Sequence, residues 1–526
     1  MGGGQRTRNE TGGVRVPSVN RRSFLAASAA ATVLPLAPDL GFLAPLSRLA
    51  AADARLDPDR VRLSSSIEAL VKLIRGTPRT KVIPVFIEQL KAGLSYHDFL
   101  AALFLATVEH GDPHQVAGIY SAHRVASEAR VEERLLPLFW ALDRIARGFE
   151  EEDLRKRPEL GGELPGGDRA QDVFAGAMKG LDPEAAERAI VALARARGSR
   201  QAMSLLWEHG ARRVEGTLGH HPIMAANTWR TLEALGWQHA EPVLRYLAGA
   251  FATSESDRTY LPNLERARKT LPALRAGWTA GEPSRGATLD LFAVVREGRT
   301  DDACDLACAQ LTAGVKAGSL WDAVHLAAAD LIFRYRTGGS LIGGYLVHAV
   351  TSTNALRCGF DCSGEDRARL LLLLQGVGVL GDLFVARARK EDQLRAMSLV
   401  DLRAVPGDPA GAKADVFAML PRKTNVYPSE EPRGAREMSD AASRRAFVLV
   451  QDATGKAGFL RSARSLLCVK ATSDPHDLKY PVAAFEDAAV VSPEWSPYLL
   501  ASSVHALHGA ASEDSAVLVE ARQALK

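Results

Sequence analysis

Residues 135–145 read Leu-Leu-Pro-Leu-Phe-Trp-Ala-Leu-Asp-Arg-Ile, and their apolar side chains recur every three or four residues. Leu135, Phe139 and Ile145 therefore fall on one face of an α-helix. The same spacing recurs nearly everywhere between residues 65 and 390, whereas the alternating pattern of a β-strand is weak throughout. The pattern predicts an all-α protein.

The predicted helices come in pairs separated by short breaks. One pair runs through Pro183–Arg197 and Arg200–Arg213, and another through Pro222–Leu235 and Ala240–Ala250. Proline at helix starts and glycine at the breaks fit these boundaries. No fixed repeat length relates the pairs, so we expect an irregular bundle of paired antiparallel helices, with a solenoid as the alternative arrangement.

Four segments follow from this pattern. Residues 1–54 precede the helical part, and residues 55–400 form the main all-helical domain. Prolines and glycines interrupt the pattern over 401–440, which predicts a long irregular connection. Helical spacing returns over 441–526, a segment too short for an independent core that we expect to pack on the main domain.

The first 54 residues have the organisation of an export signal. The adjacent Arg21 and Arg22 are followed by Ser23-Phe24-Leu25 and an apolar run, and small residues near Ala54 suit cleavage. Paired arginines indicate the twin-arginine type, so the export machinery is an expected partner and the protein is expected to be periplasmic or extracellular. An uncleaved anchor is the alternative, although prolines interrupt the apolar run early. We expect no later segment to be long and apolar enough to span a membrane.

The charge balance argues against nucleic-acid binding. The chain has 65 Lys and Arg against 62 Asp and Glu, and residues 1–54 hold six arginines and three acids, which leaves 59 of each sign. A nucleic-acid-binding protein needs surplus positive charge to displace counterions from phosphates.

Five cysteines, at 304, 308, 358, 362 and 468, lack the CxxC spacing of a zinc ribbon or redox motif. Disulfides are an alternative in an exported protein, but we expect these residues to be buried thiols.

Thirteen histidines are the main chemical signal, and several stand at predicted helix starts. The segment 109–114 contributes His110 and His114, which a surface cap would also explain. In the pair His220-His221, one imidazole can turn inward, and we assign this role to His221; a polar turn with two solvated rings is the alternative.

Two further histidines complete the candidate set. His348 lies on an apolar helical stripe, where a hydrogen-bonded core histidine is the competing interpretation. His476 is followed three residues later by Lys479, so the two can share a helical face, although a solvated helix start would give the same pattern.

Imidazoles from separate helices can converge in a helical core and bind a transition metal. The predicted metal ligands are His110, His114, His221, His348 and His476. His348, His476 and Lys479 are the predicted catalytic residues, with Lys479 holding an anionic substrate or a developing oxyanion. The chain has no HExxH motif, Walker loop or nucleophile elbow, and we do not expect a Rossmann fold.

In order, these clusters resemble the questin oxidase-like family. The segment around His110–His123, the run from His221 to Met224, the run from His348 to Arg357 and the segment His476–Lys479 carry the resemblance. It implies an all-helical fold, oxygen insertion of the Baeyer–Villiger kind on anthraquinones, and NADPH as a cofactor. The export signal and insertions near 150–168 and 405–436 depart from the family, so the resemblance supports the fold more than the substrate.

Two functions from different classes remain. The first is an exported oxidoreductase or oxygenase with a histidine-lined site acting on a small molecule. The alternative is a non-catalytic helical scaffold or small-molecule-binding protein.

Overall fold

A computed structural model describes residues 65–110, 113–151, 160–214, 216–253, 261–336, 345–402, 415–422 and 434–525. The chain divides into two units, Met1–Ala44 and Pro45–Lys526, and every described residue belongs to the second. The predicted signal peptide, including Arg21, Arg22 and the cleavage region, therefore lies outside the described residues.

The all-α prediction is confirmed. Over the described ranges there is no strand, only the isolated bridges Glu282–Val315 and Tyr335–Leu394. The α-helices in chain order are α2 Ser65–Gly76, α3 Arg79–Lys91, α4 Tyr96–His110, α5 Pro113–Glu128, α6 Leu136–Glu151, α7 Ala170–Gly180, α8 Pro183–Arg197, α9 Ser199–Arg212, α10 His220–Leu235, α11 Ala240–Thr253, α12 Leu261–Thr270, α13 Arg285–Arg296, α14 Thr300–Thr312, α15 Ala317–Arg334, α16 Val347–Cys362, α17 Asp366–Val379, α18 Arg387–Lys390, α19 Ala435–Leu449, α20 Ala453–Lys470, α21 His476–Val490, α22 Ser496–Ser503 and α23 Ala516–Ala524.

Local sequence signals set several of these boundaries. Asp182 caps α8 by accepting a hydrogen bond from the backbone N–H of Ala185, and Pro183 is the first helical residue. Gly198, with a φ of +91°, ends α8 and precedes α9. Helix α10 begins at His220 rather than at the predicted Pro222, so both histidines lie in its first turn.

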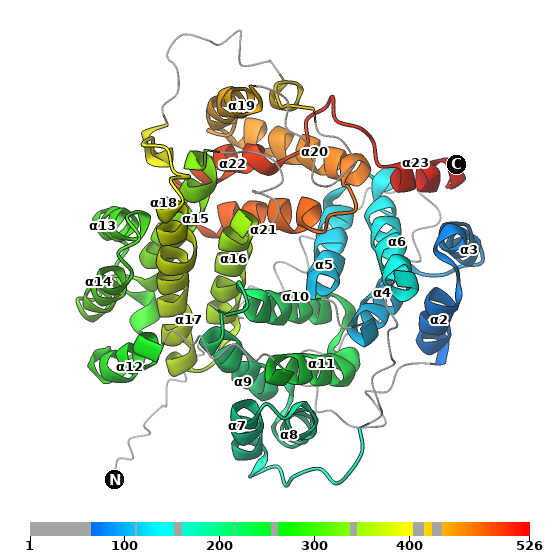
Figure 1. Cartoon of the computed structure of the whole chain (residues 1–526), viewed down its shortest axis with the longest axis horizontal. Helices are drawn as coiled ribbons and strands as arrows, with labels where there is room; N and C mark the ends of the chain where they lie inside the picture. Colours follow the sequence, from blue (N-terminus) through cyan, green and yellow to red (C-terminus); the bar gives the residue numbers. More distant parts are fainter. Residues whose placement is uncertain are drawn as a thin grey trace, which may run out of the picture. The chain divides into compact units, whose positions relative to one another are not determined.

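Four helices frame the candidate site. Helices α5, α10, α16 and α21 pack in a closed order, α5 on α10, α10 on α16, α16 on α21 and α21 on α5. Figure 1 shows them around the centre, with α21 above α10 and α16 to the left of α5. Other neighbours in sequence, such as α7 with α8 and α13 with α14, pack against each other outside this frame.

The C-terminal helices belong to the same unit as the main domain. Helix α20 packs on α5, α22 on α15 and α23 on α6. Within the connection predicted at 401–440, the structure describes 401–402, 415–422 and 434–440, and α19 already begins at Ala435 rather than at 441.

One expectation about membrane segments was wrong. The continuous helical run Asp366–Lys390, formed by α17, a π-helical segment at Leu380–Ala386 and α18, is long and apolar enough to cross a membrane. However, 83% of its most apolar window is buried inside the protein. Its apolar side chains thus serve as core against α9, α12, α14 and α16.

The same helical run also contains three glycines with the spacing of a nucleotide-binding motif. Gly376, Gly378 and Gly381 have the GxGxxG spacing of dinucleotide-binding loops. Here the glycines lie inside a buried helix rather than between a strand and a helix start, so the structural context of that motif is missing.

All five cysteines are unpaired, as expected. Cys304, Cys358 and Cys468 are buried as predicted, but Cys308 and Cys362 are partly exposed, so the prediction of burial was wrong for these two. The sulfur atoms of Cys358 and Cys362 lie 4.0 Å apart on successive turns of α16.

Candidate functional site

Four histidines from the four framing helices converge on one point. His114 lies in the first turn of α5, His220 begins α10, His348 is the second residue of α16, and His476 begins α21. We call these residues the histidine cluster. Neighbouring rings have their centroids 4.7–5.9 Å apart.

Three of these histidines meet as a potential metal-binding group. One ring nitrogen from each of His114, His348 and His476 lies within 4.8 Å of the others. His220 joins them, because its Nε2 is 3.2 Å from Nε2 of His114 and 3.1 Å from Nε2 of His348. Two nitrogens bound to a tetrahedral metal at 2.0–2.1 Å are about 3.3 Å apart, so the two contacts of His220 have the spacing of ligand atoms, whereas the other three histidines are known to approach within 4.8 Å.

Hydrogen bonds outside the cluster determine where His220 and His476 carry their protons. Nδ1 of His220 lies 2.6 Å from the carbonyl oxygen of Thr217, which can only accept, so Nδ1 carries the hydrogen and the neutral ring presents the Nε2 lone pair. Nδ1 of His476 lies 2.7 Å from Oδ1 of Asp474. This carboxylate–histidine arrangement is the outer shell that orients metal-binding imidazoles.

Nε2 of His476 is the atom with unmet bonding capacity. It is buried and has no hydrogen-bond partner among the described residues. Its ring faces those of His114 and His348, with centroids 5.1 and 5.0 Å away. A buried nitrogen without a partner costs free energy, and a bound metal or ligand would remove that cost.

A glycine brings His220 close to His348. Gly219 precedes α10 with a φ of +81°, and a Cβ at this position would lie 2.4 Å from Cβ of Ser352 on α16. Both the left-handed backbone and the close approach exclude side chains, so glycine permits the contact between α10 and α16.

The environment disfavours the charged forms of His114 and His476. Burial is the largest effect that lowers the pKa of His114, and the nearby Lys479 lowers it further. Burial also lowers the pKa of His476, although Asp474 opposes this shift. The first turns of α5, α10 and α21 add partial positive charge, which disfavours an imidazolium. Neutral imidazole is the form that binds metals.

Lys479 lies one turn beyond His476 on α21 and is 3% exposed. Its Nζ is 3.1 Å from Nδ1 of His114. A lysine ammonium has only donors, so it donates to Nδ1 and leaves the hydrogen of a neutral His114 ring on Nε2, opposite His220. The sequence-based pairing of His476 and Lys479 on one helical face thus places both at the cluster.

One predicted metal ligand, His221, is not brought into the cluster, and the side chain of a second, His110, is not among the described ones. His221 stacks on Phe251 with ring centroids 4.3 Å apart, and burial lowers its pKa to about 3, with Arg213 and His220 contributing. Its neighbour His220 occupies the position that we assigned to His221. His110 ends α4, and its side chain lies outside the described residues.

A second polar layer lies between the same helices. Arg230 of α10 donates to Oδ1 of Asn354 at 2.7 Å and lies 3.3 Å from Oε2 of Glu486, while its guanidinium covers the ring of Tyr120 at 5.3 Å. Tyr120 donates a hydrogen bond to Glu486. A small cavity of about 10 Å³ connects this layer with Lys479. No charge pattern in the sequence predicted this layer, since its members are far apart in the chain.

No family model, curated protein or solved structure matches this chain.

Proposed function

We propose that the chain is an exported oxidoreductase or oxygenase whose histidine cluster binds a transition metal. The observation that carries this proposal is the buried Nε2 of His476, which lacks a partner and faces His114 and His348. All-imidazole sites suit zinc, copper, iron and nickel. His114, His348 and His476 would hold the metal, and His220 would act as a fourth ligand or as a hydrogen-bond acceptor.

The surroundings of the cluster favour chemistry on an anionic oxygen. Lys479 and the first turns of α5, α10 and α21 place positive charge beside the site. Such charge stabilises an oxyanion or a substrate carboxylate at the reacting centre. A redox-active metal would supply electron transfer or oxygen activation, and Lys479 would hold the negative charge that develops. The resemblance to questin oxidase-like proteins agrees with this reaction class.

The alternative is a small-molecule-binding protein without a metal. It is favoured by the continuous donor chain from Lys479 to His114, from His114 to His220 and from His220 to the carbonyl oxygen of Thr217. That chain satisfies three of the side chains without an ion. It leaves Nε2 of His476 without a partner. It also places Nε2 of both His114 and His348 within 3.2 Å of the single lone pair on Nε2 of His220.

Export by the twin-arginine machinery forms part of the proposal and rests on residues 1–54. This route carries folded proteins, which suits a protein that acquires its metal before export. The mature protein would then act in the periplasm or outside the cell.

Elemental analysis of the mature protein, purified without a histidine tag, tests the proposal. We expect near-stoichiometric transition metal in the wild type, loss of the metal in His348→Ala, and retention in His221→Phe. The latter is a matched control, because His221 is buried beside the cluster but stacks on Phe251. Oxygen consumption with candidate electron donors then tests the reaction class. A folded wild type without metal, or equal metal in both variants, would contradict the proposal.

A further inference from the structure

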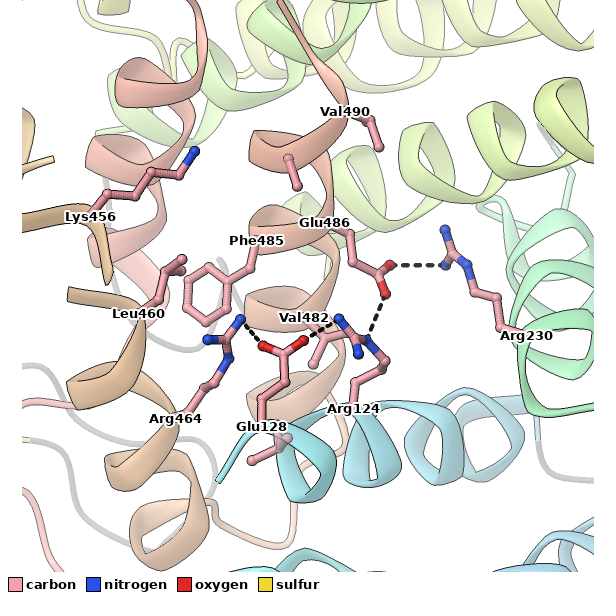
Figure 2. A pocket seen from close by; sticks show the side chains of 12 residues that line it. Arg124, Glu128, Arg230, Lys456, Leu460, Arg464, Val482, Phe485, Glu486 and Val490 are labelled. Carbon is pink, nitrogen blue, oxygen red and sulfur yellow. Dashed lines mark hydrogen bonds and ion pairs between the residues drawn. The ribbon is translucent and has the colours of Figure 1, made fainter. Parts of the chain in front are cut away.

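A cavity of about 350 Å³ lies between α5, α10, α20 and α21. Figure 2 shows side chains from these helices directed into it. Lys456, Leu460 and Arg464 follow one another at four-residue spacing on α20, so one face of this helix lines the cavity. Arg124 enters from α5 and Glu486 from α21.

The charged groups of this pocket form a chain with a positive surplus. Arg464 and Arg124 both pair with Glu128, and Arg124 and Arg230 both pair with Glu486, as the dashed lines in Figure 2 show. The fourth cation, Lys456, donates to Oγ of Ser496 at 2.7 Å, which is a neutral partner. Four cations thus share two carboxylates among the lining residues. This balance favours an anionic ligand.

The rest of the lining is apolar. Val125, Leu460, Val482 and Phe485 contribute hydrocarbon surface between the charged groups. Arg464 lies over the ring of Phe485, 5.8 Å from its centroid, so a cation and an aromatic face stand side by side. A ligand that satisfies both features has an apolar body and a negatively charged end.

The pocket shares lining residues with the small cavity that reaches Lys479. Arg230, Val482 and Glu486 line both this pocket and the small cavity that reaches Lys479. Lys479 and Glu486 are seven residues apart on α21, a rise of about 10 Å along the helix axis. The small cavity holds about 10 Å³, room for about one water molecule, so a ligand must displace the side chains around Glu486 to pass.

We propose that this pocket binds an apolar organic carboxylate, with the carboxylate at Lys456 and the apolar body directed along α21 toward Lys479. The inference rests on the proposed function, because it names the substrate class of the same site. The body would lie against Leu460 and Phe485, and its far end would reach the cluster once the contact between Tyr120 and Glu486 opens.

Isothermal titration of the purified mature protein with 2-naphthoate and with the uncharged 2-naphthamide tests this inference. We expect the carboxylate to bind about tenfold more tightly than the amide, the difference expected for a charge-assisted contact, and to weaken at high salt. Lys456→Met should lose this preference. Arg461→Met is the matched control, since Arg461 is exposed on the same helix and does not line the pocket.

A steric variant separates charge from shape. Ala489 lines the pocket, and Ala489→Trp should block both probes while the far-ultraviolet circular dichroism stays unchanged. Equal affinity for the carboxylate and the amide, or unchanged binding in both Lys456→Met and Ala489→Trp, would overturn the inference. Metal content measured on the same samples reports on the proposed function independently, so failure of one can be distinguished from failure of the other.

Discussion

Oδ1 of Asp474 accepts two hydrogen bonds from His476, one from its backbone N–H at 2.9 Å and one from its ring Nδ1 at 2.7 Å. One carboxylate oxygen therefore caps α21 and fixes the direction of the imidazole that begins it. The loop before the helix is itself braced, because Trp140 donates to the carbonyl oxygen of Thr472 at 2.6 Å. The orientation of His476 is thus built into the start of α21.

Asp474→Ala should weaken metal binding by about 10- to 100-fold, the usual cost of removing an outer-shell partner of a ligating histidine. Asp474→Asn keeps an acceptor oxygen and should weaken it less. Competition with a metal chelator measures both affinities, and thermal melting separates this effect from loss of the helix cap. Equal affinities in wild type and Asp474→Ala would show that Asp474 acts only as a cap.

The sequence predicted much of this site because its residues lie at recognisable helix starts. His114, His348, His476 and Lys479 were each identified from a cap, a proline or an apolar stripe. The choice between His220 and His221 failed for a geometric reason. One residue corresponds to about 100° around a helix, and α10 begins at His220, earlier than the proline at 222 had indicated.

Other features depended on contacts that no local pattern records. Arg124, Arg230 and Glu486 meet only because α5, α10 and α21 pack together. Likewise, the apolar run Asp366–Lys390 resembles a membrane span by composition, and only its burial identifies it as a core helix. Tertiary packing, rather than propensity, determines these roles.

Gly219→Ala should destabilise the protein by about 1–3 kcal/mol, because it places a side chain at a positive φ and against Ser352. It should also separate His220 from His348 and reduce metal content. Gly176→Ala on α7 is the control, since no atom lies within 4 Å of the added Cβ and an alanine favours the helix. Urea unfolding and metal analysis of both variants measure the two effects. Normal stability in Gly219→Ala would contradict the close approach of α10 to α16.

Acid should destabilise the fold partly through His209. Burial lowers its pKa to about 3, and Arg212, Arg213 and Arg367 add to the shift. The unfolded chain therefore binds this proton at higher pH than the folded protein does. Above about pH 6.5, His209 is neutral in both states and does not lower the unfolding free energy. As the pH decreases from about 6.5 toward 3, the unfolded chain takes up the proton first, so the unfolding free energy falls.

His209→Phe should remove this pH dependence while keeping an aromatic ring against Phe174. Between pH 6.5 and 4, we expect the unfolding free energy of the wild type to fall more steeply than that of the variant, by at most about 1.4 kcal/mol per pH unit. Urea titrations at several pH values test this. Parallel pH profiles for the two proteins would show that His209 titrates normally in the fold.

Replacing Arg21 and Arg22 by lysine should block export, because the paired arginines are what the machinery recognises. The precursor should then accumulate in the cytoplasm, whereas Arg15→Lys, outside the pair, should leave export unchanged. Cell fractionation and the N-terminal sequence of the exported protein measure both outcomes. Normal export of the double-lysine variant would argue against a twin-arginine signal.

Lys479→Met should strengthen metal binding and abolish turnover. When a metal binds Nε2 of His114, Nδ1 of a neutral ring must carry the hydrogen, and it then cannot accept from the Lys479 ammonium 3.1 Å away. The ammonium and the metal therefore compete for His114, both through this proton and through charge repulsion. Removing the amine should raise metal affinity by about tenfold, the equivalent of about 1.4 kcal/mol. Lys456→Met, which removes a charge outside the cluster, should leave metal affinity unchanged. Chelator competition measures the affinities, and weaker binding in Lys479→Met would instead make this lysine a support for the metal-bound form of His114.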